Sequence, residues 1–123
     1  MFEISSIEPA TIFAEIDSQP PLMRRRVATA YLGREICWSL IFSDASEPRE
    51  GRTRLLFDFD PHSVKMIVGE VLLSNYPSLM HAKSGESVLV RGRVKSVDKI
   101  CIELEIQALI LSRSTEQPTE AGN

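Results

Sequence analysis

Side chains that could bind a metal ion or act as acid–base catalysts are sparse in this sequence. Asp58, Asp60 and His62 stand at every second position, a pattern that could hold a divalent cation, although a polar strand end followed by a turn accounts for the same residues. Glu103 and Glu105 alternate on what reads as an outer strand face, where solvated carboxylates are usual. The phosphate-loop, dinucleotide, nucleophile-elbow and zinc-protease motifs do not occur. We therefore expect no metal, no cofactor and no catalytic activity.

Clustered arginines are the clearest sign of a ligand. Three basic side chains alternate on one face of an expected strand, and two more flank an expected hairpin loop. These candidate contacts are Arg52, Arg54, Arg91, Arg93 and Lys95. Guanidinium groups contact phosphates in a bidentate way, and single-stranded nucleic acid binds to cationic grooves. The alternative is that the strand cations pair with the acids Asp58, Glu103 or Glu105.

Aromatic platforms for stacking bases are fewer than a nucleic-acid site usually offers. Four rings stand at inward-facing strand positions and are expected in the core, namely Trp38, Phe42, Phe57 and Phe59. Tyr76, in an expected loop, is the best candidate for stacking, followed by Tyr31 and Phe13. The net charge of −3 and the pI near 5.4 exclude a strongly cationic, histone-like protein.

Three apolar residues interrupt otherwise polar strand faces. These are Ile41, Leu56 and Leu89. On a barrel they would form an outward apolar patch, which marks an interface with a protein partner or a second copy. The alternative is that an N-terminal helical segment covers the patch.

The two cysteines, Cys37 and Cys101, form no C-x-x-C pair and have no histidine at zinc-ligand spacing. We interpret them as free thiols, and a disulfide would require their strands to be neighbours. The first residues carry no basic start before an apolar run, which argues against a secretory signal. No apolar stretch of about 18 residues is present. We expect a cytoplasmic protein that has no membrane association.

Two short helices are expected before the strands. Pro9 suits a first helical position, and the apolar spacing that follows predicts a helix to Asp17. The segment 18–21 ends that helix, and a second is expected over 21–30. The run 24–26 consists of three arginines and lies on the second helix. It is either a contact site, for phosphate or for an acidic partner, or a solvated helix face.

From Gly33 onward the apolar period changes to two, which is typical of strands. Strands are expected over 33–44, 53–60, 87–97 and 100–111, the segment 64–73 fits a strand or a short helix, and 78–82 fits a helical turn. In the last strand Ile100, Ile102, Leu104, Ile106 and Ala108 are expected to face inward. Five strands with a link between the third and fourth describe a small closed barrel, and Gly92 lies where a barrel strand must bend.

Residues 83–94 (KSGESVLVRGRV) and 100–104 (ICIEL) resemble the last two strands of an OB-fold. With 33–42 as the long first strand, the resemblance spans roughly 33–111 and is most similar to bacterial tRNA-anticodon-type OB modules. Small SH3-like barrels and Greek-key sandwiches have similar strand patterns and are the alternatives. The resemblance implies a binding module, since many members bind single-stranded nucleic acid on the barrel and others bind proteins.

These observations predict a mainly β protein: a five-stranded OB-like Greek-key barrel over 33–111, preceded by two short helices in a packed extension over 1–32. The polar segment 112–123 is expected to be disordered. The expected function is non-catalytic binding of single-stranded DNA or RNA through the five basic residues and Tyr76. The alternative is a protein-interaction or self-association module that uses the three outward apolar residues.

Overall fold

The computed structural model describes residues 7–60 and 62–111. Two helices precede five strands, and two short 3-10 turns link the third strand to the fourth. In chain order the elements are α1 (Pro9–Ser18), α2 (Pro21–Thr29), β1 (Glu35–Ala45), β2 (Arg52–Asp58), β3 (Met66–Leu72), η1 (Leu73–Asn75), η2 (Pro77–His81), β4 (Ser87–Val97) and β5 (Cys101–Leu111). The segment 64–73 therefore contains a strand. The expectation for 112–123 falls outside the described residues.

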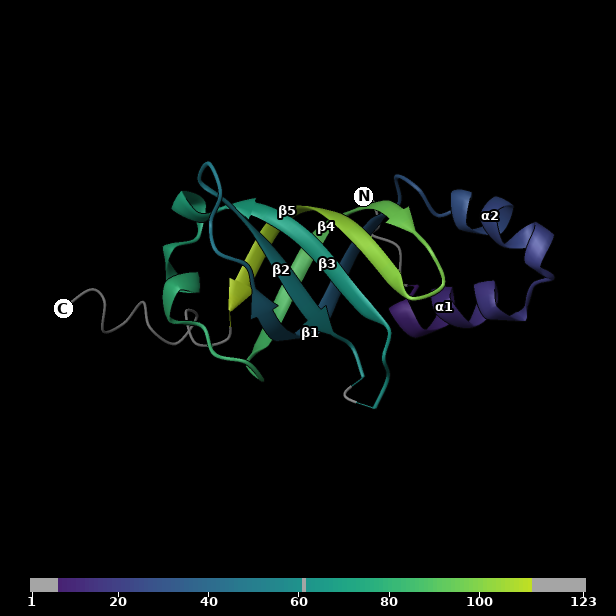
Figure 1. Cartoon of the computed structure of the whole chain (residues 1–123), viewed down its shortest axis with the longest axis horizontal. Helices are drawn as coiled ribbons and strands as arrows, with labels where there is room; N and C mark the ends of the chain where they lie inside the picture. The colour runs from purple at the N-terminus through teal and green to yellow at the C-terminus, as the bar shows by residue number, and fades with distance from the viewer. Residues whose placement is uncertain (1–6, 61, 112–123) are drawn as a thin grey trace, which may run out of the picture.

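The five strands close into a barrel in the order β1-β2-β3-β5-β4, with β4 paired back onto β1 (Figure 1). The β3–β5 pairing is parallel and the other four are antiparallel. Closure gives every strand a partner strand on both sides, which is how small barrels limit edge-to-edge association. The expected class, a mainly β five-stranded barrel after two helices, is confirmed.

The core follows from alternation along the strands, because successive side chains point to opposite faces. Phe57 is fully buried, and Trp38 and Phe42 are nearly so, as expected. The indole Nε1–H of Trp38 donates a hydrogen bond to the Ile7 carbonyl at 2.8 Å. Phe59 is only half-buried, so its assignment to the core needs correction: it stacks on Phe13 at the barrel end, with 5.5 Å between ring centroids.

The inward face of β5 changes partway along the strand. Ile102 and Leu104 are buried as expected, but beyond Ile106 the buried residues are Leu109 and Leu111. The register explains this change, because consecutive residues of β4 pair with residues of β5 that are two apart, which is a β-bulge. The expectation that Ile100 and Ala108 point into the core is therefore wrong: Ile100 is 55% exposed before the strand begins, and Ala108 is half-buried beside the bulge.

The helices close one end of the barrel (Figure 1). Ile12, Phe13 and Ile16 of α1 are 0–2% exposed and belong to the same apolar cluster as the strands. Tyr31 is also buried, and its hydroxyl donates a hydrogen bond to Glu15. Phe13 and Tyr31 are therefore unavailable for stacking on a base, which corrects the sequence-based expectation for both rings.

A polar clamp joins α1 to the barrel. Lys65 Nζ lies 2.5 Å from Asp17 Oδ2 and donates a second hydrogen bond to the Lys99 carbonyl at 3.0 Å. The hydrogen bond from Lys65 is the main cause that lowers the pKa of Asp17, and the charges of Arg24 and Lys99 act in the same direction. Within the described ranges, no helix is long and apolar enough to cross a membrane.

Candidate nucleic-acid interface

The basic side chains of β4 lie on the outer face of the barrel. Along this strand exposed and buried residues alternate, so Arg91, Arg93 and Lys95 all point outward. Arg91 stands between Cys37 of β1 and Ala108 of β5 in the strand pairing. Arg93 stands between Glu35 and Glu105 in the same way.

Four of the six candidate contacts line one surface depression, the β3–β5 hollow. The parallel pairing of β3 with β5 ends at Glu70 and Glu105, and the depression of about 650 Å³ is lined by residues around that point. Its candidate contacts are Arg52, Tyr76, Arg93 and Lys95. They come from the start of β2, the turn after η1 and the middle of β4, so only the fold brings them together.

The two other basic candidates lie outside the hollow. Arg54 is exposed on β2, where it pairs with Glu70 of β3, and Arg91 sits on β4 two residues before Arg93. Neither lines the hollow. The structure therefore separates the six residues into a group of four and two outlying arginines.

Acidic side chains share the hollow with the cations. Glu70, Glu103 and Glu105 also line it. Lys95 Nζ lies 3.6 Å from Glu103 Oε2, the kind of cross-strand pair that was the alternative role for this face. Arg93 Nη2 lies 3.3 Å from Glu35 Oε2, a partner that the sequence pattern did not suggest.

These ion pairs are weak and exchangeable. The Arg93 and Lys95 side chains are 50% and 64% exposed, and exposed pairs of this kind contribute about 0–1 kcal/mol. A phosphate group can displace such a carboxylate at small cost. The hollow is thus a mixed-charge surface that offers three cations to an anionic ligand.

Tyr76 is the one aromatic residue in the described lining of the hollow. Its ring is half-buried and packs against the core cluster, so one part of it is fixed and another faces the hollow. The following Pro77 begins η2, and the Leu79 amide donates to the Tyr76 carbonyl at 3.0 Å, which holds this turn. The arrangement places one half-buried aromatic ring beside three cations.

The outward apolar residues are placed as follows. Leu89 is 42% exposed, whereas Ile41 and Leu56 are half-buried. The helices do not cover Leu89, because they pack at the opposite end of β4, near Ser96. Leu89 pairs across strands with Ile110, which is 43% exposed. Sequence reasoning missed Ile110, because the bulge in β5 reverses which residues face outward.

Asp58, Asp60, His62 and the two cysteines are the remaining candidates for chemistry. Within residues 7–60 and 62–111, no group of three or more metal-ligating side chains gathers. The Asp60 carboxylate accepts a hydrogen bond from the His62 amide at 2.9 Å, as in an ordinary turn. Cys37 and Cys101 are free and lie on β1 and β5, which are not neighbours in the barrel. Partial burial raises the pKa of the Cys101 thiol.

Comparisons with solved structures agree with this architecture. A lipoprotein of Klebsiella pneumoniae, named as a candidate nucleic-acid-binding protein, superposes with a TM-score of 0.57 at 14% identity, over 88% of this chain and 91% of that one. OBody AM1L10, bound to hen egg-white lysozyme, gives 0.55 at 7% identity over 68% and 82%. The S. pombe Stn1–Ten1 complex gives 0.48 at 20% identity over 76% and 74%.

No protein-family model and no curated protein sequence matches the chain. At the identities above, the structural likeness concerns the fold. The closed barrel, its strand order and the likeness to the lipoprotein and to OBody AM1L10 together establish that the chain has an OB-fold.

Proposed function

We propose that this OB-fold protein is a non-catalytic binding module that takes single-stranded nucleic acid in the β3–β5 hollow. Phosphates bind Arg52, Arg93 and Lys95, and one base contacts the exposed part of Tyr76. The observation that carries the proposal is the convergence in one depression of four residues from three separate stretches of chain. The K. pneumoniae neighbour, named for nucleic-acid binding, supports the same class of ligand.

The charge balance limits this binding to a modest affinity. Three carboxylates share the hollow with the three cations, and the chain carries a net charge of −3. Non-specific attraction to nucleic acid is therefore weak, and binding depends on contacts made at the hollow itself. Arg54 and Arg91 lie on the outer surface next to the hollow, and they extend the surface that a strand of nucleic acid would contact.

Removing two cations from the hollow is expected to weaken binding and its dependence on salt. Each phosphate contact on a single strand contributes about 0.7 to the slope of log affinity against log salt, so R52Q/R93Q should reduce that slope by about 1.4. The measurement is fluorescence anisotropy with labelled random single-stranded DNA and RNA between about 50 and 200 mM salt. R25Q/R26Q is the matched control, because Arg25 and Arg26 are exposed arginines on α2 outside the hollow.

A further variant in the same titration separates stacking from charge. Tyr76→Leu keeps an apolar group against the core but removes the ring, and the loss of one base–aromatic contact should weaken binding roughly tenfold without changing the salt slope. Tyr76→Phe should retain the affinity. An absence of saturable binding by the unmodified protein at the lowest salt would falsify the proposed function.

The second candidate function is self-association or protein binding through the β4–β5 outer face. It is favoured by one observation, the exposed cross-strand pair of Leu89 and Ile110, with Ile41 and Leu56 on the strands beyond. If this pair forms a dimer interface, Leu89→Asp should shift the sedimentation equilibrium from dimer to monomer. Leu22→Asp, at a residue of α2 that is 96% exposed and away from this face, is the control. A protein that is monomeric at all concentrations contradicts self-association.

A further inference from the structure

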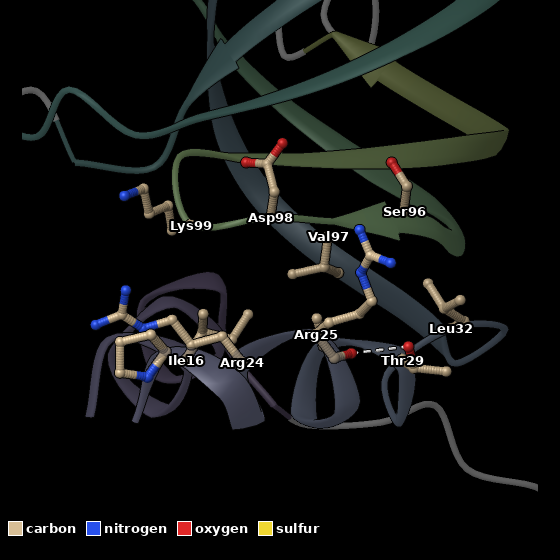
Figure 2. A pocket seen from close by; sticks show the side chains of 11 residues that line it. Ile16, Arg24, Arg25, Thr29, Leu32, Ser96, Val97, Asp98 and Lys99 are labelled. Atoms are coloured by element: carbon tan, nitrogen blue, oxygen red, sulfur yellow. Dashed lines mark hydrogen bonds between the residues drawn. The ribbon is translucent and has the colours of Figure 1, made fainter. Parts of the chain in front are cut away.

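A second depression lies outside the barrel, between the helices and the β4–β5 turn (Figure 2). This helix groove has a volume of about 430 Å³. Its base is apolar, formed by Ile16, Ala28 and Val97, and Leu32 extends the apolar surface to the solvent with 46% of its area exposed. A cleft of this size is within the range of small binding sites. Ile16 and Ala28 are only 2% and 8% exposed, so the apolar surface left to cover is that of Val97 and Leu32, and covering it gains free energy.

The two walls of the helix groove carry positive charge. Arg24 and Arg25 stand on the α2 wall, and Lys99 stands on the turn opposite. Figure 2 shows the Arg25 side chain directed from α2 toward Val97 across the groove. Arg24 Nε donates to the Gln19 carbonyl at 3.2 Å, whereas within the described residues Arg25 makes no side-chain hydrogen bond or ion pair.

The one acid in the described lining, Asp98, offsets only part of this charge. Asp98 Oδ1 accepts hydrogen bonds from the backbone amides of Ile100 and Cys101, both at 2.8 Å, so its carboxylate is used by its own turn. Figure 2 shows this carboxylate directed away from the helices. The nearby Asp17 is paired with Lys65 and also interacts with Arg24 and Lys99, which leaves four cations against two carboxylates. The local excess of cations therefore favours a negatively charged occupant.

We propose that the helix groove binds an acidic segment of a partner protein that places an apolar side chain on Val97 and carboxylates beside Arg25 and Lys99. A peptide fits this lining better than a nucleic acid, because the described lining contains no aromatic ring on which a base could stack. The groove is separate from the β3–β5 hollow, with which it shares no lining residue. This inference is therefore independent of the proposed nucleic-acid site.

The test uses the full chain and a labelled heptapeptide that has a central leucine between three glutamates on each side. Saturable binding is expected in fluorescence anisotropy, and it should weaken as salt rises. Two matched peptides, with glutamine in place of glutamate or serine in place of leucine, should bind at least about fivefold more weakly. If the acidic peptide shows no saturable binding up to about 1 mM, the proposal is wrong.

Neighbouring residues supply matched protein variants. Arg25→Glu should weaken the acidic peptide at least about tenfold, since it places like charges together, whereas Arg26→Glu makes the same charge change outside the groove and should leave the affinity within about twofold. Leu32→Ser should weaken binding about fivefold. Leu22→Ser changes a residue that is 96% exposed and outside the groove, and it should leave the affinity for the peptide unchanged. Equal effects of the paired variants would overturn the assignment.

Two other occupants would show themselves in the same set of variants. If Arg25→Glu abolishes oligonucleotide binding and leaves peptide binding unchanged, the groove belongs to nucleic acid and the proposal fails. If sedimentation shows a dimer that Leu32→Ser dissociates, the occupant is a second copy of this chain, and the proposal fails in that case too.

Discussion

Gly92→Ala is expected to destabilise the barrel by about 3 kcal/mol, at the upper end of the cost of overpacking. A Cβ atom at Gly92 would lie 2.3 Å from the Glu105 carbonyl oxygen, 3.1 Å from its carbonyl carbon and 3.2 Å from Cα of Ile106. All three are backbone atoms of the neighbouring strand. They can move only if β4 and β5 separate beside the bulge, where the strand pairing is already irregular.

Gly69→Ala provides a matched control for this prediction. A Cβ atom at Gly69 would approach Cδ1 and Cγ1 of the Ile106 side chain at 2.4 and 2.8 Å, and the nearest backbone atom, the Leu104 carbonyl oxygen, at 3.3 Å. A side chain can rotate away, so the loss should be smaller, about 1 kcal/mol, and Ile106→Val should relieve part of it because this change removes Cδ1. Urea unfolding measures both variants. If Gly92→Ala is the milder change, the close approach of the strands at Gly92 is wrong.

Gly92 also shows what local sequence can and cannot predict. A glycine in the middle of an alternating strand pattern indicates a bend or a close approach, and the close approach is found there. The compensating bulge lies on β5, and nothing in the alternation of β5 itself marks it. That bulge arises because two long strands must stay paired around a small barrel, so the exposed position of Ile110 depends on tertiary structure.

For the candidate site, too, the sequence predicts which strand face a residue lies on but not which distant residues it meets. Alternation alone places Arg93 and Lys95 on an outer face, as the structure has them. The Lys95–Glu103 pair follows from adjacent strands in the chain, whereas the Arg93–Glu35 pair requires β4 to meet β1, which happens only on closure of the barrel. The arrival of Tyr76 beside them depends on the end of the β3–β5 pairing, which no local pattern encodes.

Ile12→Ala is expected to cost about 2–5 kcal/mol, because α1 forms part of the barrel core. Ile12 is 0% exposed, and it lies in one continuous apolar cluster with residues of all five strands. Alanine has the higher helix propensity, so the change favours α1 itself and any loss of stability reports on packing. Ile100→Ala is the control, since Ile100 is 55% exposed and should change stability by no more than about 0.5 kcal/mol.

The effect of Ile12→Ala on unfolding of the strands shows whether α1 and the barrel fold as one unit. If α1 completes the core, Ile12→Ala lowers the urea midpoint of the whole chain in one transition, whether it is followed by Trp38 fluorescence or by circular dichroism. Trp38 is informative here because it is buried and its indole donates to Ile7, just before α1. A midpoint equal to that of Ile100→Ala, or helix loss that precedes the Trp38 signal, would mean that α1 covers a barrel stable without it. The helix groove would then have a movable wall, and the acidic peptide should bind Ile12→Ala more weakly.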